Sequence, residues 1–213
     1  MHSYMKRMLH IPLNTTSEQL ERLLALQRAF AQVCNALAPV VVQTRVWNRV
    51  ALHHLMYRSV RERFPELGSQ MVCNAIYSVS RTCRVVYQSP ASPFNLARLG
   101  NRPLPLLRFA DSCPVYFDRH TLSVNNGQLS MFTLDGRMRF SLALLPDAEA
   151  QFKEQKLHEI VMARQADGLF ALSFVFGDEQ GAQQDAAPQD APAGVLASAG
   201  VDLPEYVLVE ESV

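Results

Sequence analysis

Two sets of polar side chains, each repeating at helical spacing, are the residues of this sequence best suited to chemistry. The first set recurs at intervals of four and three residues and consists of Gln70, Asn74, Tyr77, Arg81, Arg84 and Gln88. That spacing places the side chains on one stripe of a helix, opposite its apolar positions. Arginines contact phosphates, amides form hydrogen bonds and a tyrosine ring can stack on a base. The stripe therefore predicts an outer surface that binds nucleic acid.

The second set lies in the preceding helical segment and combines arginines with the single tryptophan of the chain. At about 100° per residue, four of its members point within roughly 40° of a common direction. These four residues are Trp47, His54, Arg58 and Arg61. Arg45 and Arg49 belong to the same predicted surface. The alternative is a solvated face with Trp47 packed against a neighbouring element, and the pattern leaves both interpretations open.

The charges of the chain are unevenly distributed, although the formal net charge of its 213 residues is zero. Residues 43–108 hold ten arginines, no lysine and two glutamates, a local net charge of +8. Residues 177–213 hold eight aspartates and glutamates and no lysine or arginine, a local net charge of −8. Arginine suits bidentate phosphate contacts better than lysine does. A neutral total therefore hides a basic middle, which favours nucleic acid, and an acidic end.

The sequence contains no arrangement typical of a nucleophilic, acid–base or metal site. It has no G-x-S-x-G elbow, P-loop or H-E-x-x-H pattern, and nothing in it places a cysteine beside a histidine. The four cysteines form no C-x-x-C pair, so we expect reduced, buried thiols, no metal and no cofactor. The first residues lack a signal-peptide core, and no apolar run approaches the roughly 20 residues of a membrane span. We therefore expect a cytoplasmic protein without a membrane partner.

The elements that must position these side chains are predicted by the apolar periodicity. A capping box of Thr15 and Glu18 starts a first helix and Pro39 ends it, while a second helix carries Val50 on its inward side. The opening strand, the second and third helices and a Pro-rich irregular segment cover residues 4–13, 43–64, 67–87 and 89–108.

After the irregular segment, the apolar period changes from 3.6 to 2, which predicts strands. They cover residues 115–117, 121–124, 128–134, 137–144, 157–166 and 169–176, with turns at Asn126-Gly127, Asp135-Gly136 and Asp167-Gly168. We therefore predict an α+β fold, a small β-barrel with an inserted bundle of about three helices. The expected parts are a first barrel strand, the helical insertion, the other barrel strands, a flexible acidic linker and a final apolar segment, which cover 1–14, 15–108, 109–176, 177–194 and 195–213.

Five segments, in this order, give the chain a resemblance to a known family. They are TTSEQLERLLALQRAFAQVCNAL, FPELGSQMVCNAIYSVSRTCR, PVYFDRHTLSVNNGQLSMFTLDGRMRFSL, HEIVMARQADGLFALSFVF and AGVDLPEYVLVEESV. Together they resemble the N-terminal half of the transposon-encoded RNA-guided nucleases of the TnpB (OrfB) type, relatives of the type V CRISPR effectors. The resemblance covers nearly the whole chain.

The resemblance implies that the barrel and the helical lobe grip a structured guide-type RNA and the DNA near its target, while base pairing reads the sequence. Asp202 corresponds to the family's first nuclease carboxylate, and Pro204 stands where the family usually has glycine. The family's other carboxylates and its zinc-binding cysteines have no counterpart here. Because Mg²⁺ needs several carboxylates, we expect a truncated RuvC-type start with an unpaired strand and no nuclease activity by this chain alone.

Two alternatives stay open at this point. The chain is a structural or protein-interaction domain if its arginines are only solvated and its acidic end contacts a basic partner. It is one half of a split nuclease if a second chain supplies the missing carboxylates. The leading interpretation is a nuclease-inactive module that binds guide-type RNA and DNA.

Overall fold

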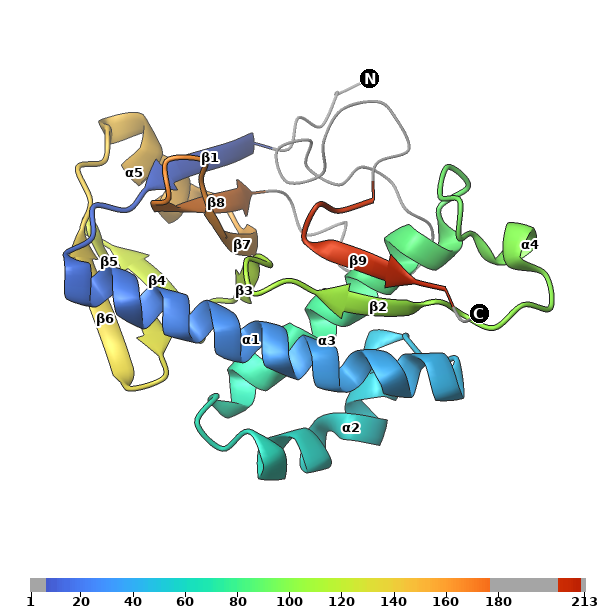
Figure 1. Cartoon of the computed structure of the whole chain (residues 1–213). Helices are drawn as coiled ribbons and strands as arrows, with labels where there is room; N and C mark the ends of the chain where they lie inside the picture. Colours follow the sequence, from blue (N-terminus) through green and yellow to red (C-terminus); the bar gives the residue numbers. More distant parts are fainter. Residues whose placement is uncertain (1–6, 177–202, 212–213) are drawn as a thin grey trace, which may run out of the picture. The chain divides into compact units, whose positions relative to one another are not determined.

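The computed structural model describes residues 7–176 and 203–211, and the chain divides into two compact units. Unit 1 comprises Met1–Leu26 and Pro114–Ala186, and unit 2 comprises Gln27–Cys113 and Ala187–Val213. Helices and antiparallel sheets both occur, so the predicted α+β class is confirmed (Figure 1). The strands form three separate sheets in the described residues, and the predicted closure into one barrel is not among their pairings.

Unit 1 contains two antiparallel sheets and a short helix. The larger sheet has the strand order β1-β8-β7-β3, and the smaller one has the order β4-β5-β6. In β8, six of seven residues are buried, because both faces of this strand are covered. The strands are β1 Arg7–Pro12, β3 Val115–Phe117, β4 Leu122–Asn125, β5 Gln128–Thr133, β6 Gly136–Ser141, β7 Leu157–Arg164 and β8 Phe170–Phe176.

Helix α5, Pro146–Glu154, packs on the larger sheet, and the sequence analysis did not predict it. The ring of Phe152 lies edge-on to those of Phe174 and Phe176, with centroids 4.9 and 5.3 Å apart. Such edge-to-face contacts add to the burial of apolar area. One aromatic side chain therefore fastens a helix that has no fully buried residue of its own.

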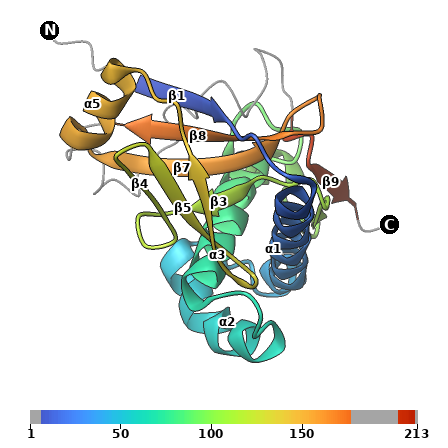
Figure 2. The ribbon, with the colours of Figure 1, turned by 90° about the vertical axis from the view of Figure 1, so that its left-hand side faces the viewer.

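The β4–β5–β6 meander follows the predicted turn chemistry and can be traced in Figure 2. Asn126 and Gly127 have φ of 49° and 72°, the left-handed values that a type I′ hairpin turn requires. A β-carbon at position 127 would also lie 3.2 Å from the Leu142 carbonyl oxygen. Glycine is therefore required there by both backbone conformation and space.

An ion pair links the first turns of α1 to this meander within unit 1. The Arg22 guanidinium donates to the Asp135 carboxylate at 2.9 Å and to the Thr133 hydroxyl at 3.0 Å. The hydroxyl of Thr133 and the guanidinium of Arg22, in that order, lower the pKa of Asp135. The carboxylate form of Asp135 is thus favoured by the fold.

Unit 2 contains the remaining helices and a two-stranded sheet. Its central helix is α3, which is buried at ten of fifteen positions and continues as the π-helical turn η1. The elements are the later part of α1 Ser17–Thr44, α2 Arg49–Arg63, α3 Ser69–Cys83, η1 Arg84–Gln88, α4 Leu96–Leu99, β2 Leu106–Phe109 and β9 Val207–Glu210. Neither β2 nor α4 was predicted, because 89–108 was expected to be irregular.

The first helix differs from its prediction at both ends. The capping box is formed by Thr16 and Gln19 and not, as predicted, by Thr15 and Glu18. The Thr16 N–H donates to the Gln19 side-chain oxygen at 3.0 Å, and the Gln19 N–H donates to the Thr16 hydroxyl at 3.2 Å. Pro39 lies inside α1 and does not end it. Although proline removes one helical hydrogen bond, the following turn buries Val41 completely, and this burial favours continuation of the helix.

Helix α1 ends at a strained residue, and for this reason the second helix begins later than predicted. Arg45 has φ of 55°, in the left-handed region that favours glycine. Asn48 then caps α2 by accepting from the N–H groups of Val50 and Ala51 at 3.0 and 3.2 Å. Val50, predicted to face inward, is 57% exposed, and the buried side of α2 carries Leu52 and Val60.

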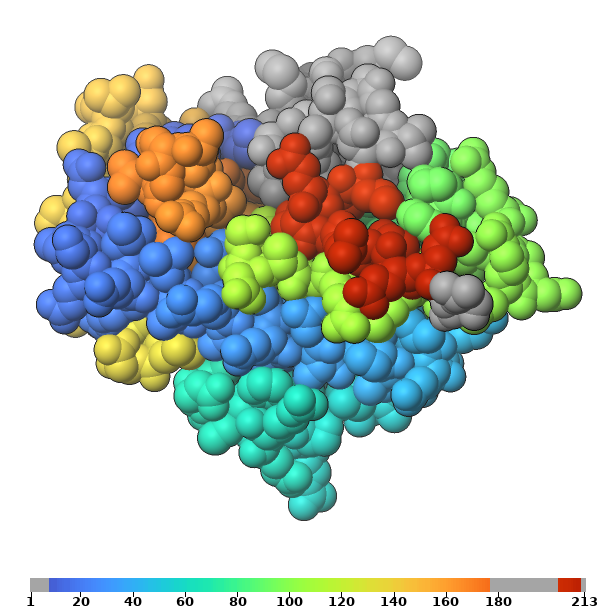
Figure 3. Space-filling view, in the orientation of Figure 1, coloured from blue at the N-terminus to red at the C-terminus, as the bar shows by residue number. Residues whose placement is uncertain are grey.

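The C-terminal segment has a partner strand, so the prediction of an unpaired strand is wrong for residues 207–210. Strand β9 pairs antiparallel with β2, with Phe109 opposite Val207, and Glu210 forms an ion pair with Arg108. Figure 3 shows residues 203–211, in red, lying against the green segment that contains β2. On α1, the Asn35 side chain accepts a hydrogen bond from the Phe109 N–H at 2.7 Å and donates one to the Phe109 carbonyl at 2.8 Å.

Among the described residues, α1 is the one helix long and apolar enough to cross a membrane by length and composition. In its most apolar window, 56% of the residues are buried within the protein. Leu23, Leu26 and Phe30 have exposures of 0 to 1%. This burial is typical of a core helix, and one such helix is weak evidence for a membrane span.

Candidate nucleic-acid interface

A groove between α2 and α3 brings several of the predicted side chains together within unit 2. Its volume is about 350 Å³, and it is lined by Arg49, Val50, His53, Gln70, Cys73 and Ile76. Because Asn48 caps α2, Arg49 occupies the first helical position, at the rim of the groove. The groove thus combines a permanent positive charge with an amide and an imidazole, groups that can bind a phosphate or a base edge.

Cationic and aromatic groups alternate beside this groove. The Arg49 guanidinium lies 5.2 Å from the centroid of the Tyr77 ring, a cation–π distance. The Tyr77 hydroxyl in turn accepts a hydrogen bond from Arg81 at 3.2 Å. Tyr77 therefore orients two arginines from two helices. We call Arg49, Gln70, Tyr77 and Arg81 the α2–α3 cluster.

His53 and Cys73 are groove residues that the sequence analysis missed. His53 stacks on Tyr57, one turn further along α2, with ring centroids 4.6 Å apart and an interplanar angle of 20°. The groove lining includes both His53 and Cys73, although nothing in the sequence placed a cysteine beside a histidine. Their helices follow each other in the sequence and pack together. That succession was the one sequence signal that could have brought these two residues to the same groove. His53 also lies four residues after Arg49, on the same side of α2.

The remaining members of the predicted second set are not in the α2–α3 cluster. Trp47 precedes α2 and packs on Tyr87, with ring centroids 5.4 Å apart, as in the alternative interpretation of this residue. Arg61 donates to the Leu67 carbonyl at 2.6 Å and so holds the α2–α3 connection. His54 and Arg58 are exposed on the solvent side of α2, and Arg58 pairs with Glu62 at 3.4 Å. Arg45 lies in the connection between α1 and α2 and is exposed.

The predicted first stripe is less accessible than expected. Asn74 is only 5% exposed and donates to the Met71 sulfur, so it belongs to the core. Arg84 is half-buried and Gln88 is exposed, and both lie in η1, where a π-helical turn changes the direction of successive side chains. The stripe is therefore not an open outer face. Neighbouring elements cover α3, and its polar side chains emerge only at the margins.

The C-terminal segment covers one end of α3. The Tyr206 hydroxyl is hydrogen-bonded to Thr82 and lies near the Arg81 charge, and burial raises the pKa of this phenol. The backbone supports the same docking, because Ala110 donates to the Tyr206 carbonyl at 2.9 Å. The described part of the acidic end thus approaches the α2–α3 cluster at Arg81.

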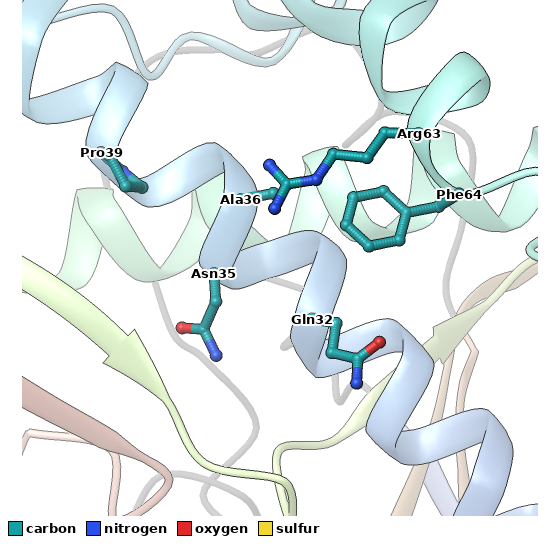
Figure 4. Close-up of a pocket in the computed structure, with 6 residues that line it drawn as sticks. All are labelled: Gln32, Asn35, Ala36, Pro39, Arg63 and Phe64. Carbon is teal, nitrogen blue, oxygen red and sulfur yellow. The ribbon is translucent and has the colours of Figure 1, made fainter.

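A larger groove of about 560 Å³ lies elsewhere in unit 2 and is drawn in Figure 4. The side chains of Arg63 and Phe64 extend toward Ala36 of α1 in this view, and the Arg63 guanidinium lies 5.2 Å from the Phe64 ring centroid. Asn35 also lines the groove, but its amide is bonded to Phe109. Gln32 and Arg63 supply the other polar groups of this groove, which has no imidazole in its lining, whereas the α2–α3 groove includes His53.

The cysteines are buried thiols in three of four cases, as predicted. Cys34, Cys83 and Cys113 are buried without a disulfide, and Cys73 is half-buried. Burial raises the pKa values of Cys34 and Cys83, and the same cause raises that of Tyr87. A thiol must ionise to act as a nucleophile or metal ligand, so Cys34 and Cys83 are inert packing groups.

Asp202 lies outside the described residues, so its correspondence to a nuclease carboxylate stays a prediction. Within residues 7–176 and 203–211, no three His, Cys, Asp or Glu side chains are grouped as metal ligands. Asp118 caps its own turn by accepting from the His120 and Thr121 N–H groups at 3.0 Å, as expected for aspartate in a turn. No family model and no curated protein matches this chain.

Proposed function

We propose that the chain binds structured guide-type RNA and DNA through the α2–α3 cluster and the arginines around it. The observation that carries this proposal is the Arg49–Tyr77–Arg81 arrangement, in which a ring orients two permanent cations beside the groove between α2 and α3. Phosphates can bind the guanidinium groups, and an unpaired base can contact the ring and the Gln70 amide. The exposed Arg45 extends the positive charge beyond the groove.

The finer architecture belongs to the same proposal. We infer that the strands of unit 1 correspond to the barrel of the RNA-guided transposon nucleases, and that unit 2 corresponds to the helical insertion of their barrel. This is supported by the position of Gln27–Cys113, which interrupts unit 1 in the sequence and belongs, together with Ala187–Val213, to a separate compact unit. In this proposal the protein acts in the cytoplasm as a nuclease-inactive binding module derived from such a nuclease.

The salt dependence of RNA binding tests the proposed interface. Each phosphate neutralised contributes about 0.7–0.9 to the slope of log affinity against log salt concentration. We expect Arg49→Gln to reduce that slope by about one such contribution and to weaken binding of a labelled hairpin RNA in a fluorescence anisotropy titration. Lys153→Gln removes one exposed positive charge from α5 of unit 1 and is the matched control. An affinity that does not change with salt concentration contradicts the proposal.

The proposed lack of nuclease activity is tested separately. A two-metal site needs several oxygen ligands around ions about 4 Å apart. We expect DNA to stay intact when the protein is incubated with Mg²⁺ or Mn²⁺, guide-type RNA and matching DNA. Cleavage that disappears in Asp202→Ala would show that a second copy or another chain completes the site.

A further inference from the structure

The outer face of the β4–β5–β6 sheet is polar and uncovered, and neither predicted set of side chains includes it. Leu122, Leu129, Met131, Met138 and Phe140 point inward and are at most 7% exposed. Because side chains alternate along a strand, the intervening residues share the other face. The strand register aligns them in rows across the sheet, and they are Ser123, Asn125, Gln128, Ser130, Phe132, Arg137, Arg139 and Ser141.

An aromatic ring and an arginine are held together on this face. Phe132 is 39% exposed, and the Arg137 guanidinium lies 4.1 Å from its ring centroid. Arg137 lies directly opposite Phe132 in the β5–β6 register, and it also donates to the Ser130 hydroxyl at 3.1 Å and to the His120 carbonyl at 3.4 Å. The ring and the guanidinium plane are therefore oriented before any ligand arrives, which reduces the ordering entropy of binding.

The charge of the face is positive. Arg137 and Arg139 are exposed on it, and none of the eight outward positions holds a carboxylate. The aspartates of the flanking turns are engaged, since Asp118 caps its turn and Asp135 is paired with Arg22. The carboxylate of Glu149 lies beside Gly127, at the turn between β4 and β5 and away from Arg139 and Phe132 in the register. Hydroxyl and amide groups occupy the remaining positions, and the Gln128 amide is bonded to Ser141 at 2.9 Å.

We propose that this face is a second nucleic-acid site, which binds a single strand by stacking a base on Phe132. Arg139 would contact a phosphate, while Asn125 and Ser123 would contact base edges. A single strand fits better than a duplex, because paired bases present only their edges and cannot stack on a side chain of an open sheet. The site lies entirely in unit 1 and does not depend on the α2–α3 cluster.

The test uses the full chain and a uridine-rich single-stranded RNA that contains a photoreactive 5-bromouridine. We expect ultraviolet crosslinks to map by mass spectrometry to the peptide that contains Phe132. Stacking contributes about 1–3 kcal/mol per base, so Phe132→Ala should weaken single-strand affinity about 5- to 150-fold. Phe132→Tyr, which keeps a ring, should retain the affinity. Arg139→Gln should lower the salt slope by about 0.7.

Leu169→Ala is the matched control, because Leu169 also belongs to unit 1 and is likewise 39% exposed. Crosslinks that map only outside β4–β6, or a Phe132→Ala protein with unchanged single-strand affinity, would overturn the proposal. An equal loss for single strand and duplex would overturn it as well. Arg49→Gln serves as the independent probe of the α2–α3 cluster, so the failure of one site is distinguishable from the failure of the other.

Discussion

Replacing Arg45 with glycine separates the conformation of this residue from its charge. Arg45 ends α1 with φ of 55°, and its N–H donates to the Val41 carbonyl at 2.8 Å. A left-handed conformation costs a non-glycine residue about 1–2 kcal/mol, whereas glycine loses about 0.5–1 kcal/mol more conformational entropy on folding. The difference favours Arg45→Gly by about 0.5–1 kcal/mol. In a chain of this length, that raises the unfolding midpoint by about 1–4 °C.

The single tryptophan provides the assay, because Trp47 packs on Tyr87 inside unit 2. Its fluorescence follows the unfolding of this unit even if the two units do not unfold together. Arg45→Ala is the control, since it removes the same charge but keeps the β-carbon in the left-handed conformation. We expect glycine to be more stable than alanine, and both variants to bind RNA less tightly than the wild type. A glycine variant no more stable than the alanine variant would refute the argument from strain.

Three further predictions concern the core, pH and the acidic end. Ile76→Ala should destabilise unit 2 by about 2–5 kcal/mol, because Ile76 is fully buried, whereas Val50→Ala, 57% exposed, should change stability by less than about 0.5 kcal/mol in the same denaturation assay. The raised pKa of Tyr206 means that the fold favours the neutral phenol. Stability should therefore be independent of this group below about pH 10 and fall as the pH rises further, and Tyr206→Phe should remove that part of the decline measured by Trp47 fluorescence. Truncation of the acidic end would also remove β9, so its competition with nucleic acid is better tested by exchanging carboxylates for amides. The altered protein carries amides in place of the carboxylates of Asp178, Glu179, Asp185 and Asp190. Its RNA affinity at low salt should rise if the acidic end competes with RNA, and should stay unchanged if these residues only contact solvent.

Local rules predicted the strands and turns of unit 1 well. Asn126-Gly127 specifies a type I′ turn by itself, and alternation then determines which side chains of β4, β5 and β6 are buried. The larger sheet was also located, with β7 and β8 within a few residues of the predicted strands. The pairing of β1 with β8, whose partner residues are 159 to 169 positions apart, could not be read from any short segment.

The candidate site was predicted only in part, because periodicity shows which residues share a direction but not how many sides of a helix are covered. The spacing correctly put Gln70, Tyr77 and Arg81 on α3, yet it treated Asn74 as exposed. It also assumed one continuous helix through Trp47, since a left-handed arginine such as Arg45 has no sequence signal comparable to glycine. Phe132 was counted as part of a strand and was not recognised as an exposed ring.

The pairing of β2 with β9 has a consequence for protein synthesis. Phe109 and Val207 lie opposite each other but are 98 residues apart. At about 5–20 residues per second, β2 leaves the ribosome roughly 5–20 s before its partner. Asn35 is already made and can bond Phe109 during this interval, while the N–H of Ala110 has to wait for the Tyr206 carbonyl. A nascent chain therefore carries an open strand edge after its helices have formed, and contacts between chains on one polysome would begin at that edge.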